Sequence, residues 1–142
     1  MFTFSIHSFN NATHQYILQP HFFVLNKGLN SGKPLKNHSP NCFVITSKSE
    51  EEKDLLFCLC WGLWQSKKFH SLLTGSVIPF IRLHEFKPFI NQQAAIAFTE
   101  KEQYNKNVKA LQQLEALEKK YNQNLILIND AKRAIFKKAT LR

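Results

Sequence analysis

The sequence is poor in the residues and segments that would place a small protein outside the cytoplasm. It has three cysteines, an odd number, and no run of about 18 apolar residues that could span a membrane. Its first residues, "MFTFSIHSFN", lack the basic and apolar regions of a secretion signal. These absences predict a protein of a reducing compartment, without a membrane partner.

The few cysteines and histidines are not spaced as metal ligands or as a nucleophilic site. Cys58 and Cys60 are two residues apart on a predicted helix and point in opposite directions, and Cys42 lies in an apolar strand pattern. The six histidines form no His-x₃-His pair. Acids cluster only at the predicted start of one helix, so no separated acid/base pair is visible. We therefore expect a non-enzymatic protein with no metal, no cofactor and no small-molecule substrate.

Glycine is also scarce, with four in the chain, and two of them lie in "NKGLNSGKPLKNHSPNCF", residues 26–43. A phosphate-binding P-loop has four residues between its glycines and a Ser or Thr after its lysine. Here three residues separate Gly28 from Gly32, and Pro34, which disfavours helix at Lys33, follows that lysine. The pattern favours a strand connection with glycines at positive φ. The alternative is a basic loop that meets a nucleic-acid backbone through Lys27, Lys33, Lys36 and His38.

Acidic residues are outnumbered by basic ones, 10 against 19, which gives a net charge of +9. Such an excess favours nucleic acid or an acidic partner. Both halves of the chain carry it, so we assign it to a folded surface. Sixteen of the bases are lysines and three are arginines. Lysine suits loose phosphate contact, whereas arginine favours bidentate reading of bases.

Aromatic residues are abundant at 13% of the chain, and four phenylalanines between residues 67 and 89 alternate with bases. Bases interleaved with aromatic rings can bind single strands by stacking. The other interpretation is an ordinary core beside a solvated face. The basic candidates for nucleic-acid contact in this segment are Lys67, Lys68 and Arg82.

Apolar periodicity predicts the elements of the first 92 residues. Alternation in "FTFSIHSF", "HFFVLN" and "NCFVIT" predicts three strands. Ser49 and Glu52 fit a capping box that starts a helix over about 50–68, apolar nearly all round and therefore buried. "TGSVIPFIRLHEF" predicts a turn and a strand, at an edge or bulged because of Pro79, and "HEFKPFI" a short helix or turn.

From Gln92 to Arg142 the sequence has no glycine or proline. Thr99 and Glu102 suggest a second capping box, and apolar residues then recur at steps of three and four, close to a heptad pattern. A continuous helix would form a rod of about 60 Å, and a fold-back at "YNQN", residues 121–124, would form a hairpin. Both stay open. The residues expected to face a partner helix or a second copy are Val108, Leu111, Leu114, Leu117, Tyr121, Leu125, Ile128 and Ile135.

These elements predict an α+β fold. A small, mostly antiparallel sheet packs on one buried helix within a globular domain over residues 1–92. A long, coiled-coil-like helix or helical hairpin occupies residues 93–142.

Two resemblances extend this interpretation. The block from "LNKGLNSGKPLKNHSPNCF" to "RLHEFKPFI" resembles an uncharacterised family of short proteins from Bacteroidota genomes, mobile elements and phages, which has no established activity. The phrases "GLWQSKKF" and "GSVIPFIRLHEF" and the long helix after them resemble target recognition domains of restriction-modification specificity subunits. That second resemblance implies DNA recognition and a helix that pairs with another helix. The chain has no methyltransferase motif, so the resemblance implies recognition without catalysis.

The expected function is therefore a non-enzymatic DNA-binding module that oligomerises through its C-terminal helix. The alternative is a structural or auxiliary capsid or assembly protein of a phage or mobile element, whose basic face would meet acidic protein. A third alternative is an inhibitor of a host defence enzyme. The expected location is the cytoplasm of a bacterial or infected cell, or a virion.

Overall fold

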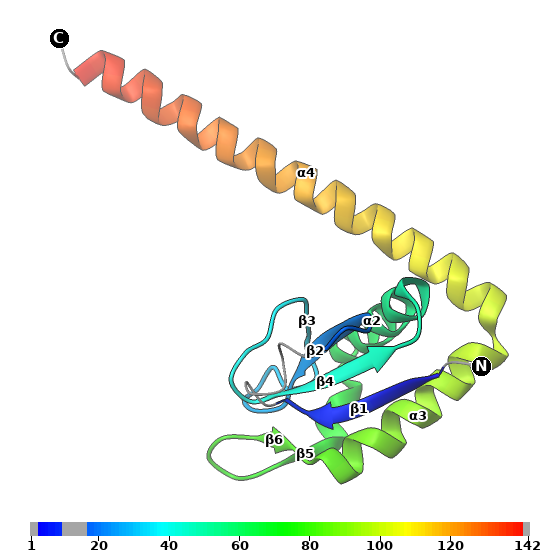
Figure 1. The fold of residues 1–142 in the computed structure, drawn as a ribbon. Coiled ribbons are helices and arrows are strands. Elements are labelled where there is room, and N and C mark those ends of the chain that lie inside the picture. Colours follow the sequence, from blue (N-terminus) through cyan, green and yellow to red (C-terminus); the bar gives the residue numbers. More distant parts are fainter. Residues whose placement is uncertain (1–2, 10–16, 141–142) are drawn as a thin grey trace. The chain divides into compact units, whose positions relative to one another are not determined.

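The fold is centred on a four-stranded antiparallel sheet, in a computed structural model that describes residues 3–9 and 17–140 (Figure 1). The strand order is β1-β4-β2-β3, and every neighbouring pair is antiparallel. The prediction of an α+β protein with an antiparallel sheet and a long C-terminal helix is confirmed. The bounds of β1, β2, β3 and β4 are Phe4–Ser8, His21–Leu25, Pro34–Leu35 and Cys42–Ser47.

Alternating side chains give the sheet two apolar faces. Phe22 and Val24 join the main core on one face, while Phe23 between them lies on the other face with Cys42 and Val44. This alternation follows from the two-residue period of a strand. In β4, Cys42 and Val44 accordingly lie on the opposite face from Phe43 and Ile45.

Helix α2 (Glu50–Gln65) packs on the main core through Leu56, Cys60 and Leu63. Its first turn begins as predicted, because the Ser49 hydroxyl oxygen accepts a hydrogen bond of 3.2 Å from the Glu52 N–H. The Glu52 carboxylate differs from the expected capping box: it accepts a bond of 3.3 Å from the N–H of Thr3, and thereby links α2 to the start of β1.

A further helix, α3 (Leu83–Thr99), lies where only a short helix or turn was predicted. It contains Pro88 and buries Phe86, Ile90, Ala94 and Ala97. The first three of these belong to the same core as α2. The sheet is thus covered by two helices, one more than expected.

Between α2 and α3 the chain forms the short 3₁₀ helix η1 (Lys68–Leu72) and a small hairpin. The hairpin strands β5 (Leu73–Thr74) and β6 (Phe80–Ile81) pair only over two residues each. The longer strand predicted after Gly75 is therefore wrong in its extent. The last four residues of that segment, 83–86, form the start of α3.

Helix α4 (Lys101–Thr140) is continuous across residues 121–124, so the structure has the rod and not the hairpin. Thr99 does not cap it. Thr99 is the last residue of α3, and its hydroxyl donates to the Ala95 carbonyl at 3.0 Å. The chain divides into two compact units, residues 1–104 and 105–142. In the part of the chain that the structure describes, no helix combines the length and the hydropathy that crossing a membrane requires.

Candidate nucleic-acid interface

The loop of residues 26–33 is a tight turn held by its own hydrogen bonds. The Gly32 N–H donates to Leu25 O at 2.7 Å, and the Lys33 N–H donates to Asn30 O at 3.0 Å. Inside the turn the Ser31 hydroxyl, on a side chain 2% exposed, donates to Gly28 O at 2.6 Å. The backbone then enters strand β3, whereas a P-loop would enter a helix.

The two glycines of this loop have different structural roles. Gly28 has a φ of +95° and open space where a Cβ would be. Gly32 has a φ of +99°, and a Cβ there would lie 2.2 Å from Cδ2 of Phe69, a buried residue of η1. Gly32 therefore permits the close approach that packs the loop against η1.

Near the end of α2, Trp64 contacts two basic residues, one through its ring and the other through its backbone carbonyl. The Lys33 ammonium lies 5.2 Å from the centre of the Trp64 ring, a cation–π contact. The Lys67 N–H donates to Trp64 O at 3.0 Å, and Lys67 takes a left-handed conformation with a φ of 59° that ends the helix and leaves its side chain exposed. Trp64 is half-buried, and the ammonium of Lys33 lies beside its ring.

Two further cations lie next to Phe80 in the β5–β6 hairpin. Lys27 forms an isolated antiparallel bridge with Phe80, and the adjacent Gly28 N–H donates to Pro79 O at 2.7 Å. The Arg82 guanidinium lies 5.8 Å from the centre of the Phe80 ring. The loop thus brings together cations that are far apart in sequence. We call Lys27, Lys33, Lys67 and Arg82 the loop cations.

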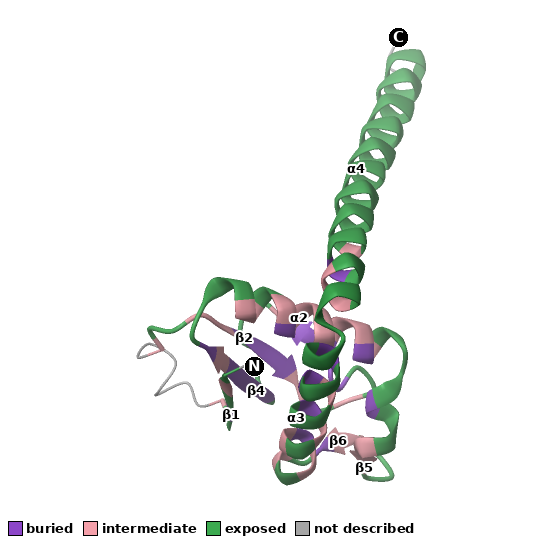
Figure 2. Cartoon of the chain, turned by 90° about the vertical axis from the view of Figure 1, so that its right-hand side faces the viewer, coloured by how far each residue is buried: buried purple, intermediate pink, exposed green. Residues whose placement is uncertain are grey.

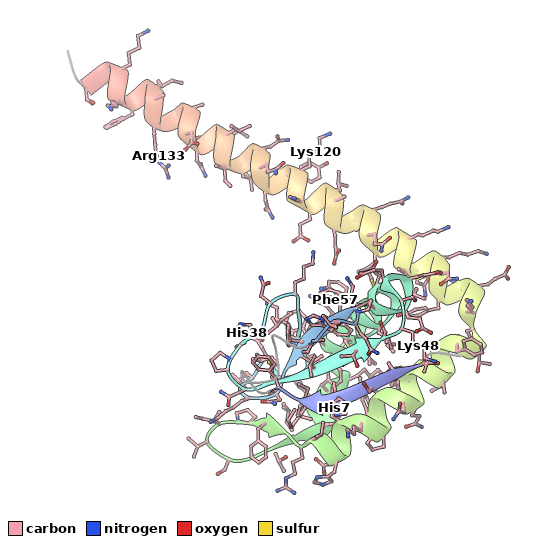
Figure 3. All side chains as sticks on the ribbon, in the orientation of Figure 1. His7, His38, Lys48, Phe57, Lys120 and Arg133 are labelled. Carbon is pink, nitrogen blue, oxygen red and sulfur yellow. The ribbon has the colours of Figure 1, made fainter. Side chains whose placement is uncertain are left out.

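The remaining predicted nucleic-acid contacts lie on other segments. Lys36 is exposed on the connection from β3 to β4, and Lys68 is exposed at the start of η1. His38 packs on aromatic rings: it stacks on Phe9 with ring centres 5.1 Å apart and meets Phe23 edge-on at 6.1 Å (Figure 3). These contacts belong to the second face of the sheet, away from the main core.

Acidic residues are absent from the segments that build this region. Residues 1–49 and 55–84 contain no Asp or Glu, and seven Lys and Arg residues. Among the lysines and arginines that the structure describes, only Lys53 and Arg133 pair with an acid. The charge of the loop cations is therefore not neutralised by a salt bridge, and the positions of the acids in the sequence would have revealed this.

The interleaved phenylalanines turn out to be of two kinds. Phe69 and Phe86 are 1% and 0% exposed and belong to the core, and Phe89 packs against it. Only Phe80 of this group accompanies a cation on the loop side. Trp64, which sequence reasoning missed, is the second ring, and only the tertiary approach of Lys33 identifies it.

A cleft of about 350 Å³ lies at the start of α2, and sequence reasoning did not predict it. Its walls mix bases and acids, and Oε2 of Glu52 is buried without a hydrogen-bond partner. Because the opposite charges largely balance, this cleft offers no net attraction for an anion. Its lining residues are Lys48, Ser49, Glu51, Glu52, Leu55, Phe98 and Lys101.

Two of the three cysteines, Cys42 and Cys60, are buried. Burial raises the pKa of the Cys60 thiol strongly and that of Cys42 as well, although Cys42 also donates to Ser39 O at 3.0 Å. Burial likewise raises the pKa of Tyr104, whose hydroxyl donates to Leu55 O. Protonated groups of this kind are poor nucleophiles. Over residues 3–9 and 17–140, no group of three or more His, Cys, Asp or Glu residues is arranged to hold a metal ion.

The second unit presents an apolar stripe on α4, which is exposed along most of its length (Figure 2). Leu125 and Ile128, for example, are 57% and 51% exposed. Two of the predicted partner-facing residues differ, since Val108 is 7% exposed and Leu111 is half-buried. We call the exposed set the α4 stripe: Leu114, Leu117, Tyr121, Leu125, Ile128 and Ile135.

The fold and its surfaces define a class of small α+β protein, with an antiparallel sheet, an acid-free cationic loop region and a long helix with exposed apolar residues. The chain belongs to a family of unknown function, DUF6943, whose model matches residues 6–138. No curated protein matches the chain, and neither does any solved structure.

Proposed function

We propose that this protein is a non-enzymatic DNA-binding module that oligomerises through its C-terminal helix. The observation that carries the proposal is the group of loop cations, which lie in or beside one hydrogen-bonded turn, in segments without a single acid. An uncompensated positive surface of this kind attracts the phosphate backbone of DNA, and the affinity of the protein for DNA then falls as the salt concentration rises.

The chemistry of the region favours backbone contact over reading of bases. Three of the four loop cations are lysines, which act as point charges towards phosphate. Lys33 and Arg82 each lie against an aromatic ring that is only half-buried. Rings beside cations can accept an unstacked base, so binding to single strands is expected alongside binding to duplex.

Oligomerisation would strengthen such binding without new contacts. A second copy held by α4 would present a second set of loop cations to the same DNA. The second contact is then intramolecular, so the apparent affinity rises by avidity. Pairing through the α4 stripe would therefore strengthen the binding of DNA by the loop cations.

The experiment compares two triple variants of equal charge by fluorescence anisotropy with labelled duplex and single-stranded DNA. Changing the three lysines among the loop cations, Lys27, Lys33 and Lys67, to Ala is expected to weaken binding by roughly ten- to a hundred-fold at low salt. The control changes Lys106, Lys109 and Lys119 on α4 to Ala, which removes the same charge. Equal losses in the two variants, or no loss in the first, would contradict the proposal.

A second candidate function is an assembly protein of a phage or mobile element. It is favoured by four consecutive exposed apolar residues on α4, Leu125 to Ile128, which lie on all sides of the helix and exceed what one partner helix covers. Recovery of the chain in purified particles, together with no affinity for free DNA, would favour this function over the first.

A further inference from the structure

We propose that α4 pairs with α4 of a second copy in the antiparallel orientation. The inference rests on the proposed oligomerisation and specifies its geometry. It follows from two charged residues that interrupt the α4 stripe and that a parallel pair would bring into conflict.

Apart from Leu117, which falls on the flanking position g, the residues of the α4 stripe follow one heptad register, and this register extends from Leu111 to Ala139. Leu111, Leu125 and Ala139 fall on the first core position, which is conventionally named a, and the exposed residues Glu118 and Lys132 fall on that same position. The second core position, d, is apolar or aromatic throughout this span. Its residues are Leu114, Tyr121, Ile128 and Ile135.

A parallel, in-register pair would set like charges against each other. In parallel coiled coils each a residue faces the same residue of the other helix. Glu118 would then face the partner's Glu118, and Lys132 would face the partner's Lys132. Both contacts are repulsive and would lie in the seam, where water is partly excluded and screening is weak.

The antiparallel pair removes both conflicts. With its two-fold axis beside Gln123, each a residue packs next to a d residue, so that Leu125 meets the partner's Tyr121 and Lys132 meets the partner's Leu114. Glu118 then lies four residues, or about 6 Å along the helix axis, from the level of the partner's Lys132. Because side chains lean towards the N-terminus of their own helix, these two lean towards each other. The two-fold axis repeats this contact, so the dimer contains two pairs of Glu118 with Lys132.

The residues that flank the seam fit this arrangement. In antiparallel pairs like-named flanking positions face each other, so Asn122 meets the partner's Asn122 and Asn124 meets the partner's Asn124. Both are uncharged side chains that can exchange hydrogen bonds. Lys120 and Arg133 both project from α4 (Figure 3). They fall on positions c and b of the heptad, outside the seam, and Arg133 is already paired with Asp130 at 3.1 Å. No like-charge contact is therefore created at these flanks.

Charge reversal in the full chain tests the orientation by sedimentation equilibrium. Each of E118K and K132E turns both attractive pairs into repulsive ones and is expected to weaken the dimer about tenfold or more. The double variant E118K/K132E exchanges the partners and is expected to return to within about threefold of the wild type. K120E, the control, makes the same charge change as K132E outside the seam and leaves the dimer unchanged. Far-UV circular dichroism checks that each variant keeps its helix.

The outcomes separate the orientation from the oligomerisation itself. Single variants that dimerise like the wild type would overturn the antiparallel pair, because a parallel pair only exchanges one repulsion for another. A double variant no better than the singles would also overturn it. A wild-type chain that stays monomeric at all concentrations would overturn both this inference and the proposed oligomerisation. A dimer with the expected charge pattern but no affinity for DNA would support the pairing and contradict only the DNA-binding function.

Discussion

At the scale of single residues, the stability of the loop over residues 26–33 depends on the backbone conformation of its glycines and on their packing against neighbouring side chains. Positive φ is costly for any residue with a Cβ, by about 1–2 kcal/mol. Gly28 and Gly32 both have it, but only Gly32 also lies against a ring. The two positions therefore separate the cost of conformation from the cost of packing.

Gly32→Ala is expected to destabilise the fold more than Gly28→Ala. At Gly28 the new methyl enters open space, so only the conformational cost of about 1 kcal/mol applies. At Gly32 the methyl must displace the buried Phe69 ring, which brings the loss to roughly 2–5 kcal/mol. Urea unfolding of the two variants measures the difference. Equal losses at both positions would contradict the account of the loop packing.

Single residues of the candidate site were predictable only in part. Lys27, Lys33 and Arg82 are visible as bases in a sequence with few acids. Their grouping is not, because Lys33 reaches Trp64 and Arg82 reaches Phe80 through contacts that the folded chain creates. The sequence presents His38 as one more basic candidate, yet its ring packs on Phe9 and Phe23, an environment that periodicity does not reveal.

At the scale of elements, capping pairs in the sequence predicted one helix start correctly and one wrongly. Ser49 and Thr99 both stand three residues before a glutamate. Only Ser49 has the extended conformation of an N-cap, with φ −139° and ψ 157°, while Thr99 still belongs to the preceding helix. The pattern alone cannot distinguish the two, because the backbone geometry decides which hydroxyl can accept the free N–H.

The different positions of Ser49 and Thr99 lead to a prediction about stability. Ser49→Ala is expected to cost about 1 kcal/mol, because the Glu52 N–H loses its acceptor. Thr99→Ala is expected to change stability by less than about 0.5 kcal/mol, because alanine suits the helix at least as well as threonine. Thermal unfolding followed by circular dichroism compares the two. A larger loss at Thr99 than at Ser49 would show that the helix boundaries are misplaced.

Helix α3 forms although it contains a proline, which the sequence pattern alone does not lead one to expect. Pro88 removes a backbone donor and crowds the preceding turn, which disfavours a long helix across it. The buried residues Phe86, Ile90 and Ala94 nevertheless recur every four residues along one side, and Pro88 itself is exposed. Their burial in the main core outweighs the local cost. Helix α4, by contrast, was predictable because its pattern continues for forty residues without a breaker.

At the scale of the whole molecule, the segregation of charge links fold to function. Four acids lie at the start of α2, where their negative charges interact favourably with the positive end of the helix dipole. The other acids lie from residue 85 onwards. The sheet, its loops and the hairpin are left with bases only, a distribution that folding stability does not require. An uncompensated surface of this kind is typical of proteins that bind polyanions.

The most direct test of this account is the salt dependence of DNA binding by the full chain. The logarithm of the association constant should fall linearly with the logarithm of salt concentration, with a slope of about −0.9 per phosphate contacted on duplex. Changing Lys27 alone to Ala should make that slope shallower by about one unit, whereas Lys106→Ala should leave it unchanged. A slope near zero, or no binding to duplex or single strands at low salt, would contradict the proposed function.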